Sequence, residues 1–331
     1  DHQEDHPEHE PCAGRVRAVE AGPAALVLGL VAASRQTDKE LVYSGYPITP
    51  ASSILEMVST YKHFGIKSVQ AEDEIAAIGV AVGASFAGAI GITGTSGPGM
   101  CLKSEFMGLA TSTELPLVIV NVQRGGPSTG LPTKTEQSDL LQAMFGRSGE
   151  SPCILLAPQS PSDCFFMAIE AVRLAIEHMC PVILLSDGHI ANGAEPWSVP
   201  KLEELPDLTV HFRTDDAEHF HPYARDSRTL ARPWVIPGTP GLEHRIGGLE
   251  KRDVTGTVNY DPLNHEHMIH LRADKIAAVA ESIPPLEVDG PEEGDLLVIG
   301  WGSTYGAIVG ALEEAHHEGL SVAGAHLRYL H

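Results

Sequence analysis

Short apolar runs alternate with amphipathic segments along most of the chain. The apolar runs predict strands, and the segments in which apolar residues recur at intervals of three and four predict helices. The predicted strands cover residues 41–43, 67–70, 89–93, 117–122, 154–157 and 182–185. The predicted helices cover residues 24–34, 51–64, 72–86, 100–113 and 161–177. Regular alternation of strand and helix predicts an α/β fold with a doubly wound parallel sheet.

The segment from Leu117 to Val122 is an apolar run of six residues, interrupted only at Asn121. Strands of this kind are typical of the interior of a parallel sheet, where helices cover both faces. We therefore expect this segment to be buried on both sides.

The pattern weakens between residues 192 and 281, where Pro, Gly, His and charged residues are frequent. We expect an extended excursion there, with a small hairpin around Gly256. A single β-α-β unit follows, with strands at residues 296–299 and 321–327 around a helix at 307–318.

The chain therefore divides into four predicted parts. They are an acidic, His-rich linker (1–21), an α/β domain (22–191), an interdomain segment (192–284) and the start of a second α/β domain (285–331). One β-α-β unit is too small for a domain, so we expect the second domain to be truncated. The linker-like start likewise suggests that a further piece precedes residue 1.

Composition narrows the function classes. Asp and Glu number 44 against 22 Lys and Arg, for a formal net charge of −22, and aromatic residues are 5% of the chain. Such a charge repels phosphate backbones, and few aromatic rings are present for base stacking, which argues against nucleic-acid binding. Residues 75–94 carry no charge, but they are rich in Ala and Gly and follow three acidic residues. They predict a close-packed buried helix and strand rather than a membrane span.

The cysteines indicate a reducing compartment. None of the five belongs to a Cys-x-x-Cys pair, and the odd count and spacings predict free thiols in a cytoplasmic chain without its own metal or iron–sulfur site. The first ten residues are mostly His, Asp and Glu and do not form a signal peptide. The cysteines are Cys12, Cys101, Cys153, Cys164 and Cys180.

Two loops at predicted strand ends are candidates for ligand binding. Tyr46-Pro-Ile-Thr-Pro50 lies at the carboxyl edge of the sheet, where ligands of open α/β sheets bind, although Thr49 is equally suited to cap the next helix. Gly94-Thr-Ser-Gly-Pro-Gly99 indicates either close backbone approach to a ligand or a tight turn whose glycines adopt positive φ. Neither loop matches a dinucleotide or P-loop fingerprint, which argues against NAD and ATP.

Two charged segments complete the candidates. Glu72-Asp73-Glu74 heads an apolar helix, where acids either complement the helix dipole or place one carboxylate in a cleft, with a pKa raised by the apolar helix. Arg124, in Arg124-Gly-Gly-Pro-Ser-Thr-Gly130, follows the buried strand and is well placed to bind a carboxylate through two hydrogen bonds. A solvated surface arginine is the alternative.

Together these segments resemble the α subunits of 2-oxoacid:ferredoxin oxidoreductases, in particular the 2-oxoglutarate type. The resemblance runs from about residue 22 to residue 331. The matching segments are Tyr46-Pro-Ile-Thr-Pro50, Gln70-Ala-Glu-Asp-Glu-Ile-Ala-Ala77, Gly94-Thr-Ser-Gly-Pro-Gly99, Arg124-Gly-Gly-Pro-Ser-Thr-Gly130, Gly241-Leu-Glu-His244 and Asp261-Pro-Leu-Asn-His265.

The resemblance implies a thiamine diphosphate enzyme in which residues 22–191 are the pyrimidine-binding domain and the second domain is similar to the C-terminal domain of transketolase. It implies that Glu74 forms a hydrogen bond with N1′ of the aminopyrimidine ring. If the alignment with the family is instead anchored on Gln70, this role falls to Glu72. Thr49 and Arg124 would hold the 1-carboxylate and 2-oxo oxygen of the substrate, with Thr129 as an additional substrate contact.

The resemblance also implies partners and a reaction. A β subunit would carry the diphosphate site, Mg²⁺ and a [4Fe–4S] cluster, alongside a γ domain or subunit and ferredoxin. The reaction would convert a 2-oxoacid, expected to be 2-oxoglutarate, and CoA into acyl-CoA and CO₂ with electrons passed to ferredoxin. Pyruvate or a branched-chain 2-oxoacid, a non-redox thiamine diphosphate decarboxylase or synthase, and an inactive scaffolding subunit are the alternatives.

Overall fold

Six parallel strands form the main sheet in the order β3-β2-β4-β5-β7-β6. The computed structural model describes residues 17–215 and 217–331. The strands are β2 (Leu41–Gly45), β3 (Lys67–Gln70), β4 (Ile90–Thr95), β5 (Leu117–Gln123), β6 (Ile154–Leu156) and β7 (Pro181–Asp187). This arrangement confirms the predicted doubly wound α/β fold.

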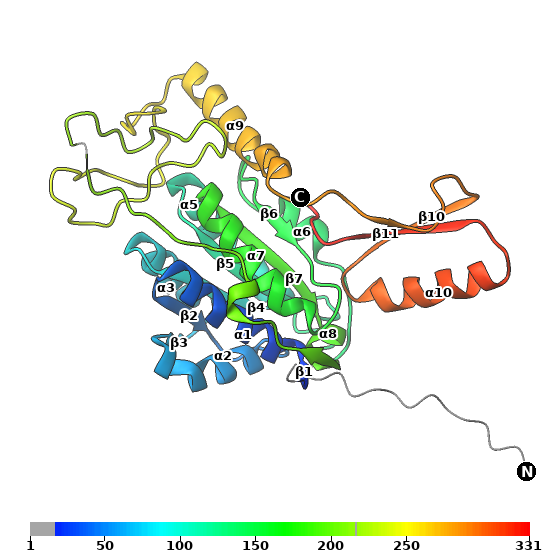
Figure 1. Cartoon of the computed structure of the whole chain (residues 1–331). Coiled ribbons are helices and arrows are strands. Elements are labelled where there is room, and N and C mark those ends of the chain that lie inside the picture. Colours follow the sequence, from blue (N-terminus) through cyan, green and yellow to red (C-terminus); the bar gives the residue numbers. More distant parts are fainter. Residues whose placement is uncertain (1–16, 216) are drawn as a thin grey trace, which may run out of the picture.

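Helices cover both faces of this sheet (Figure 1). One hydrophobic cluster contains residues of α1 (Gly22–Thr37), α2 (Ser52–Val58) and α7 (Asp163–His178). The other contains residues of α3 (Glu74–Phe86), α4 (Gly97–Leu102), α5 (Ser104–Thr113) and α6 (Leu140–Phe145). Strand β5 is buried throughout, with Val118 in the first cluster and Ile119 in the second, so the expected central strand is confirmed.

Two predicted helices are interrupted. The first ends as α2 at Val58 and continues as the 3₁₀ helix η1 (Ser59–Phe64). The hydroxyls of Ser59 and Thr60 donate to main-chain carbonyls one turn back, which competes with regular helix geometry. The second is divided into α4 and α5 at Lys103, whose side chain is completely buried.

The segment after β7 contains more regular structure than expected. Following α8 (Gly188–Asn192), strand β8 (Ala194–Ser198) pairs with β1 (Arg17–Ala21), so the last five residues of the predicted linker form a strand. Residues 1–16 of that linker, including Cys12, lie outside the described residues. The pairing joins positions about 175 residues apart, so no local sequence pattern could predict it.

A helix of 16 residues, α9 (Pro262–Ala277), contradicts the expectation of an extended segment there. Only Met268 and Lys275 of this helix are buried, so its sequence shows little apolar periodicity. The start of the helix, however, has a local sequence signal. The Asp261 side chain accepts a hydrogen bond from the Leu263 amide, and Pro262 occupies the first turn. The short 3₁₀ helices η2 (Leu202–Glu204) and η3 (Ala278–Glu281) lie in the same segment.

The predicted hairpin and β-α-β unit are both confirmed. Lys251 and Val258 form an antiparallel bridge around Gly256, which has a φ of +70°. Farther on, β10 (Leu296–Trp301) and β11 (Val322–Leu327) are parallel and flank η4 (Gly302–Thr304) and α10 (Tyr305–His317), while β9 (Val288–Asp289) pairs antiparallel with β11. Figure 1 shows this unit extending away from the main sheet.

The uncharged run at residues 75–94 forms α3 and β4. Strand β4 is fully buried, but α3 is buried on one face only, because Ile75, Val80 and Phe86 are 44%, 36% and 43% exposed. The expectation of a close-packed buried helix is therefore wrong for the outer face of α3. Within residues 17–215 and 217–331, none of the helices has the length and apolar character needed to cross a membrane.

Candidate functional site

The topological switch point of the main sheet lies between β2 and β4. From β2 the chain moves outward to β3, then returns to the other side of β2 and continues through β4 to β5. In open α/β sheets, ligands bind outside the carboxyl ends of the strands where the order reverses in this way. The Tyr46 hydroxyl and the Thr95 hydroxyl meet at this point, 3.0 Å apart.

Arg124 joins the loops that follow β5 and β2. Its Nη1 donates to the main-chain carbonyl of Thr49, and the residue is only 7% exposed. Its Nε is buried and has no hydrogen-bond partner among the described residues. The surface-arginine alternative is therefore wrong, and the site holds a buried guanidinium with one N–H group that lacks an acceptor.

Thr49 is brought to Arg124 through its main chain, and the residue itself is exposed. It does not cap the next helix, because the residue before α2 is Ala51 and no side chain caps this helix end. Instead, the Ser52 hydroxyl accepts a hydrogen bond from the Ile48 amide and donates to the Ile48 carbonyl.

The three acidic residues at the start of α3 have different environments. Asp73 caps the helix by accepting a hydrogen bond of 2.8 Å from the Ala76 amide, so the helix-end interpretation applies to this residue. Glu74 is half-buried and lies close enough to Tyr46 to raise the pKa of its hydroxyl, whereas Glu72 is exposed. The structure therefore brings Glu74, and not Glu72, to the switch point.

Thr129 lies in an exposed loop. The loop is closed by a bridge between Gly125 and Leu131, and the Gly126 amide donates to Glu136 at 2.8 Å. No contact recorded for the described residues joins Thr129 to Arg124 or Thr49, so its substrate role stays a prediction.

The glycine-rich turn serves the packing of two tyrosines. None of Gly94, Gly97 and Gly99 has a positive φ, so the tight-turn explanation is wrong. A Cβ on Gly94 would lie 2.0 Å from the Tyr43 hydroxyl, and one on Gly99 would lie 2.1 Å from the Tyr46 hydroxyl. Glycine is therefore required at these two positions to admit the tyrosine side chains, one of which belongs to the site.

Two titratable groups of the site were not predicted. Burial, followed by the interaction with Glu74, raises the pKa of the Tyr46 hydroxyl to about 12. Burial lowers the pKa of the Lys103 ammonium to about 7, against the opposing effect of Glu74 and Asp73. Tyr46 belongs to the Tyr46–Pro50 loop. The inward direction of Lys103 has no local signal, because lysine at a helix surface is usually solvated.

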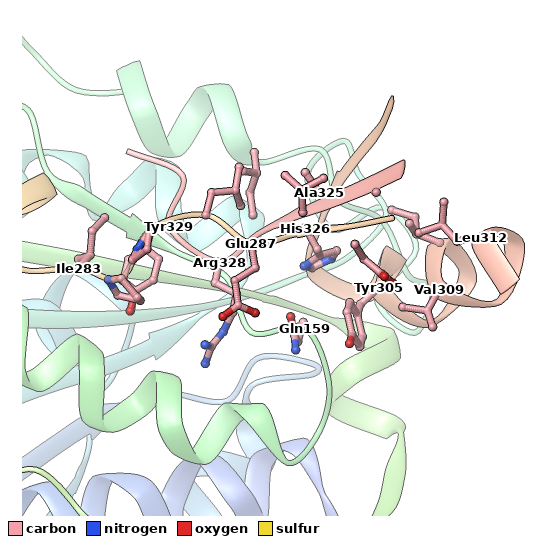
Figure 2. Close-up of a pocket in the computed structure, with 18 residues that line it drawn as sticks. Gln159, Ile283, Glu287, Tyr305, Val309, Leu312, Ala325, His326, Arg328 and Tyr329 are labelled. Atoms are coloured by element: carbon pink, nitrogen blue, oxygen red, sulfur yellow. The ribbon is translucent and has the colours of Figure 1, made fainter. Parts of the chain in front are cut away.

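A cavity of about 620 Å³ lies elsewhere, between α10, β11 and the segment that precedes β9. Figure 2 shows Tyr305, His326 and Arg328 among the side chains around it. None of the predicted site residues lines this cavity. Among residues 17–215 and 217–331, no cluster of three or more His, Cys, Asp and Glu side chains is arranged to hold a metal ion.

Comparison with known proteins identifies relatives over most of the chain. Residues 37–260 match the family described as "Pyruvate flavodoxin/ferredoxin oxidoreductase, thiamine diP-bdg". The 2-oxoglutarate oxidoreductase subunit KorA of Mycobacterium tuberculosis is 55% identical over 311 residues, which are 94% of this chain and 47% of the relative. The 2-oxoglutarate synthase subunit KorA of Methanothermobacter marburgensis is 35% identical over 285 residues, which are 84% of this chain and 73% of the relative.

A solved structure agrees with these relatives. The 2-oxoglutarate:ferredoxin oxidoreductase from Magnetococcus marinus, with 2-oxoglutarate, coenzyme A and succinyl-CoA bound, matches with a TM-score of 0.90 at 39% identity, over 97% of this chain and 55% of that one. A split-gene transketolase, at 13% identity and a TM-score of 0.50, shares the fold alone. The chain spans about half the length of the Mycobacterium and Magnetococcus relatives. By sequence and by structure, it belongs to the pyruvate flavodoxin/ferredoxin oxidoreductase family of thiamine diphosphate-binding proteins.

Proposed function

We propose that this chain is the aminopyrimidine- and substrate-binding part of a 2-oxoglutarate:ferredoxin oxidoreductase. The reaction converts 2-oxoglutarate and CoA into succinyl-CoA and CO₂, and two electrons reduce ferredoxin. The observation that carries the proposal is the meeting of Glu74, Tyr46 and Arg124 at the switch point between β2 and β4. The Magnetococcus relative, with 2-oxoglutarate, coenzyme A and succinyl-CoA bound, supports this choice of substrates.

The residues of the site fit an aminopyrimidine ring. Glu74 offers a half-buried carboxylate, and the apolar side chain of Ile75 follows it on α3. Such a carboxylate can hold a proton against a ring nitrogen, which we assign to N1′. When bound, thiamine diphosphate supplies the carbon nucleophile and electron sink for decarboxylation. Glu74 is thus the residue that would hold and exchange the proton at the ring.

Arg124 fits the anionic end of a 2-oxoacid. Its guanidinium is held in place by the Thr49 carbonyl and retains a buried, unpartnered Nε–H. A substrate carboxylate or 2-oxo oxygen would satisfy that donor, and burial strengthens a charge-assisted hydrogen bond. The exposed hydroxyls of Thr49 and Thr129 are the proposed additional contacts.

The exposed apolar side chains on the surface of α3 and α4 fit a partner subunit. Ile75, Val80 and Phe86 of α3 and Leu102 of α4 are between 36% and 53% exposed. Exposed apolar patches of this kind mark protein interfaces. We assign this surface to a β subunit that holds the diphosphate, Mg²⁺ and a [4Fe–4S] cluster. The further partners in this proposal are a γ domain or subunit and ferredoxin. We also propose a cytoplasmic location, because the four free cysteines of the described residues agree with a reducing compartment.

Replacing Arg124 by Ala should raise KM for the 2-oxoacid and lower kcat together, with a loss in kcat/KM of about 10- to 100-fold. The reason is that a buried charge-assisted contact is lost at the carbon that reacts. Steady-state kinetics of the assembled complex measure this. Arg228, which is exposed and pairs with Glu177, is the matched control, and its Ala variant should keep both constants. Unchanged kinetics in Arg124→Ala would remove Arg124 from the site.

A substrate panel on the intact complex, purified without oxygen, tests the proposed reaction. We expect CoA-dependent reduction of a viologen dye with 2-oxoglutarate and none with pyruvate or 2-oxoisovalerate. Reduction with another of these acids would keep the mechanism and change the substrate. If a complex that contains thiamine diphosphate and iron reduces the dye with none of them, the redox assignment is wrong.

A further inference from the structure

Lys103 is a lysine with no exposed surface, set between α4 and α5. Its Nζ donates to the main-chain carbonyl of Glu74 at 2.9 Å and to the Thr93 hydroxyl at 3.0 Å. It also lies 5.3 Å from the centre of the Tyr46 ring. The side chain thus joins the start of α3 to β4 beneath the proposed site.

The burial of the Lys103 ammonium group lowers the stability of the fold. Neither acceptor is charged, and none of the ion pairs found among the described residues involves Lys103. Burying an ammonium group without an ion pair is unfavourable, which agrees with its pKa of about 7. A neutral apolar residue of similar size would fill the position at lower cost. Groups of this kind are concentrated at functional sites.

We propose that Lys103 is a positioning residue for Glu74, holding the first turn of α3 so that the Glu74 carboxylate faces the aminopyrimidine ring. The inference rests on the proposed function, because it needs Glu74 to meet the cofactor. Lys103 itself is completely covered, so it does not touch the substrate. It acts through the Glu74 main chain and through its charge beside Glu74 and Tyr46.

The test compares Lys103→Met with the wild-type complex. Methionine keeps the approximate length of the side chain and removes the ammonium group. We expect affinity for thiamine diphosphate, measured by quenching of tryptophan fluorescence, to fall about 10-fold. We also expect kcat to fall by about 10- to 100-fold while KM for 2-oxoglutarate changes less than about threefold, because the defect lies at the cofactor and not at the substrate.

Lys251→Met is the matched control. Lys251 is 4% exposed and donates to the main-chain carbonyl of Ser112 at 2.8 Å, in the last turn of α5. Lys103 precedes the first turn of the same helix, about 13 Å from Ser112 along its axis. Removing the Lys251 ammonium should therefore leave cofactor affinity and kcat unchanged. Equal losses in both variants would mean that any buried lysine supports the fold in this way, and the proposal would be wrong.

Thr93→Val keeps the proposal testable if Lys103→Met does not fold. It removes one of the two acceptors of Nζ and leaves the lysine in place. We expect a loss of cofactor affinity in the same direction, but smaller. Wild-type affinity and kcat in a folded Lys103→Met or Thr93→Val complex would overturn the positioning role. A wild-type complex that binds no thiamine diphosphate would instead overturn the proposed function, and the role of Lys103 with it.

Discussion

Glu74→Gln is expected to lower kcat by about 10²- to 10⁴-fold, the range over which a positioned proton donor or acceptor accelerates a reaction. Glutamine preserves the size of the side chain and can still form a hydrogen bond, but it cannot exchange a proton at the ring. Cofactor affinity should change much less than kcat. Anaerobic turnover assays, together with the thiamine content of the purified complex, separate the two effects.

Glu72→Gln is the matched control for this experiment. Glu72 is two residues away, carries the same charge and is exposed. We expect its kcat to stay within about twofold of wild type, as is usual for surface substitutions. If Glu72→Gln loses turnover and Glu74→Gln keeps it, the role at N1′ belongs to Glu72.

Glu114→Gln is expected to give the largest loss of stability. Glu114 directly follows α5 and is 5% exposed. Its carboxylate accepts hydrogen bonds on both oxygens from Arg225 and on one from Lys275. The amide would leave buried Lys275 without its counter-ion and Arg225 paired with Asp253 alone, and removing one partner of a buried ion pair typically destabilises a protein by about 3–5 kcal/mol. Chemical denaturation followed by tryptophan fluorescence measures the change in the unfolding free energy.

The pH dependence of that loss has a definite sign. Burial alone would raise the pKa of Glu114, but Lys275 and Arg225 lower it to about 2, against an ordinary value of 4.5. A carboxylate with a depressed pKa in the folded protein stabilises it above pH 4.5 and loses this contribution as the pH falls toward 2. The difference between wild type and Glu114→Gln should therefore be full at pH 7 and should shrink below pH 4.5.

A surface carboxylate provides the comparison. Glu40 pairs with Lys67, but the two side chains are 43% and 64% exposed. Such pairs contribute about 0–1 kcal/mol because solvent screens them. Glu40→Gln should therefore leave the unfolding free energy nearly unchanged at every pH. A similar small effect in Glu114→Gln would show that the buried cluster does not hold the 225–275 segment against α5.

The sequence predicted the fold class and the positions of the strands because both depend on local patterns. An apolar run such as Leu117–Val122 has few alternatives to a buried strand, and the hairpin at Gly256 needed only short-range turn signals. The sequence also indicated the loops that carry the site. Thr49 and Arg124 both follow strands, and parallel strands end at one edge of the sheet.

Other features depend on residues that meet only after folding. The strand order sets the switch point between β2 and β4, and it brings Glu74 rather than Glu72 to Tyr46. It also explains why Gly94 must be glycine, since the Tyr43 hydroxyl comes from the neighbouring strand. None of these contacts joins residues that are adjacent in the chain.

Buried polar side chains show the limit of local patterns most clearly. Lys103 meets the Glu74 carbonyl across 29 positions, and Lys275 meets Glu114 across 161. Neither lysine has a local sequence signal for burial, because local spacing contains no information about an acceptor on another element. Whether an ammonium group faces water or the interior is determined by the partner that the tertiary structure supplies, since an unpartnered charge is not stable inside a protein.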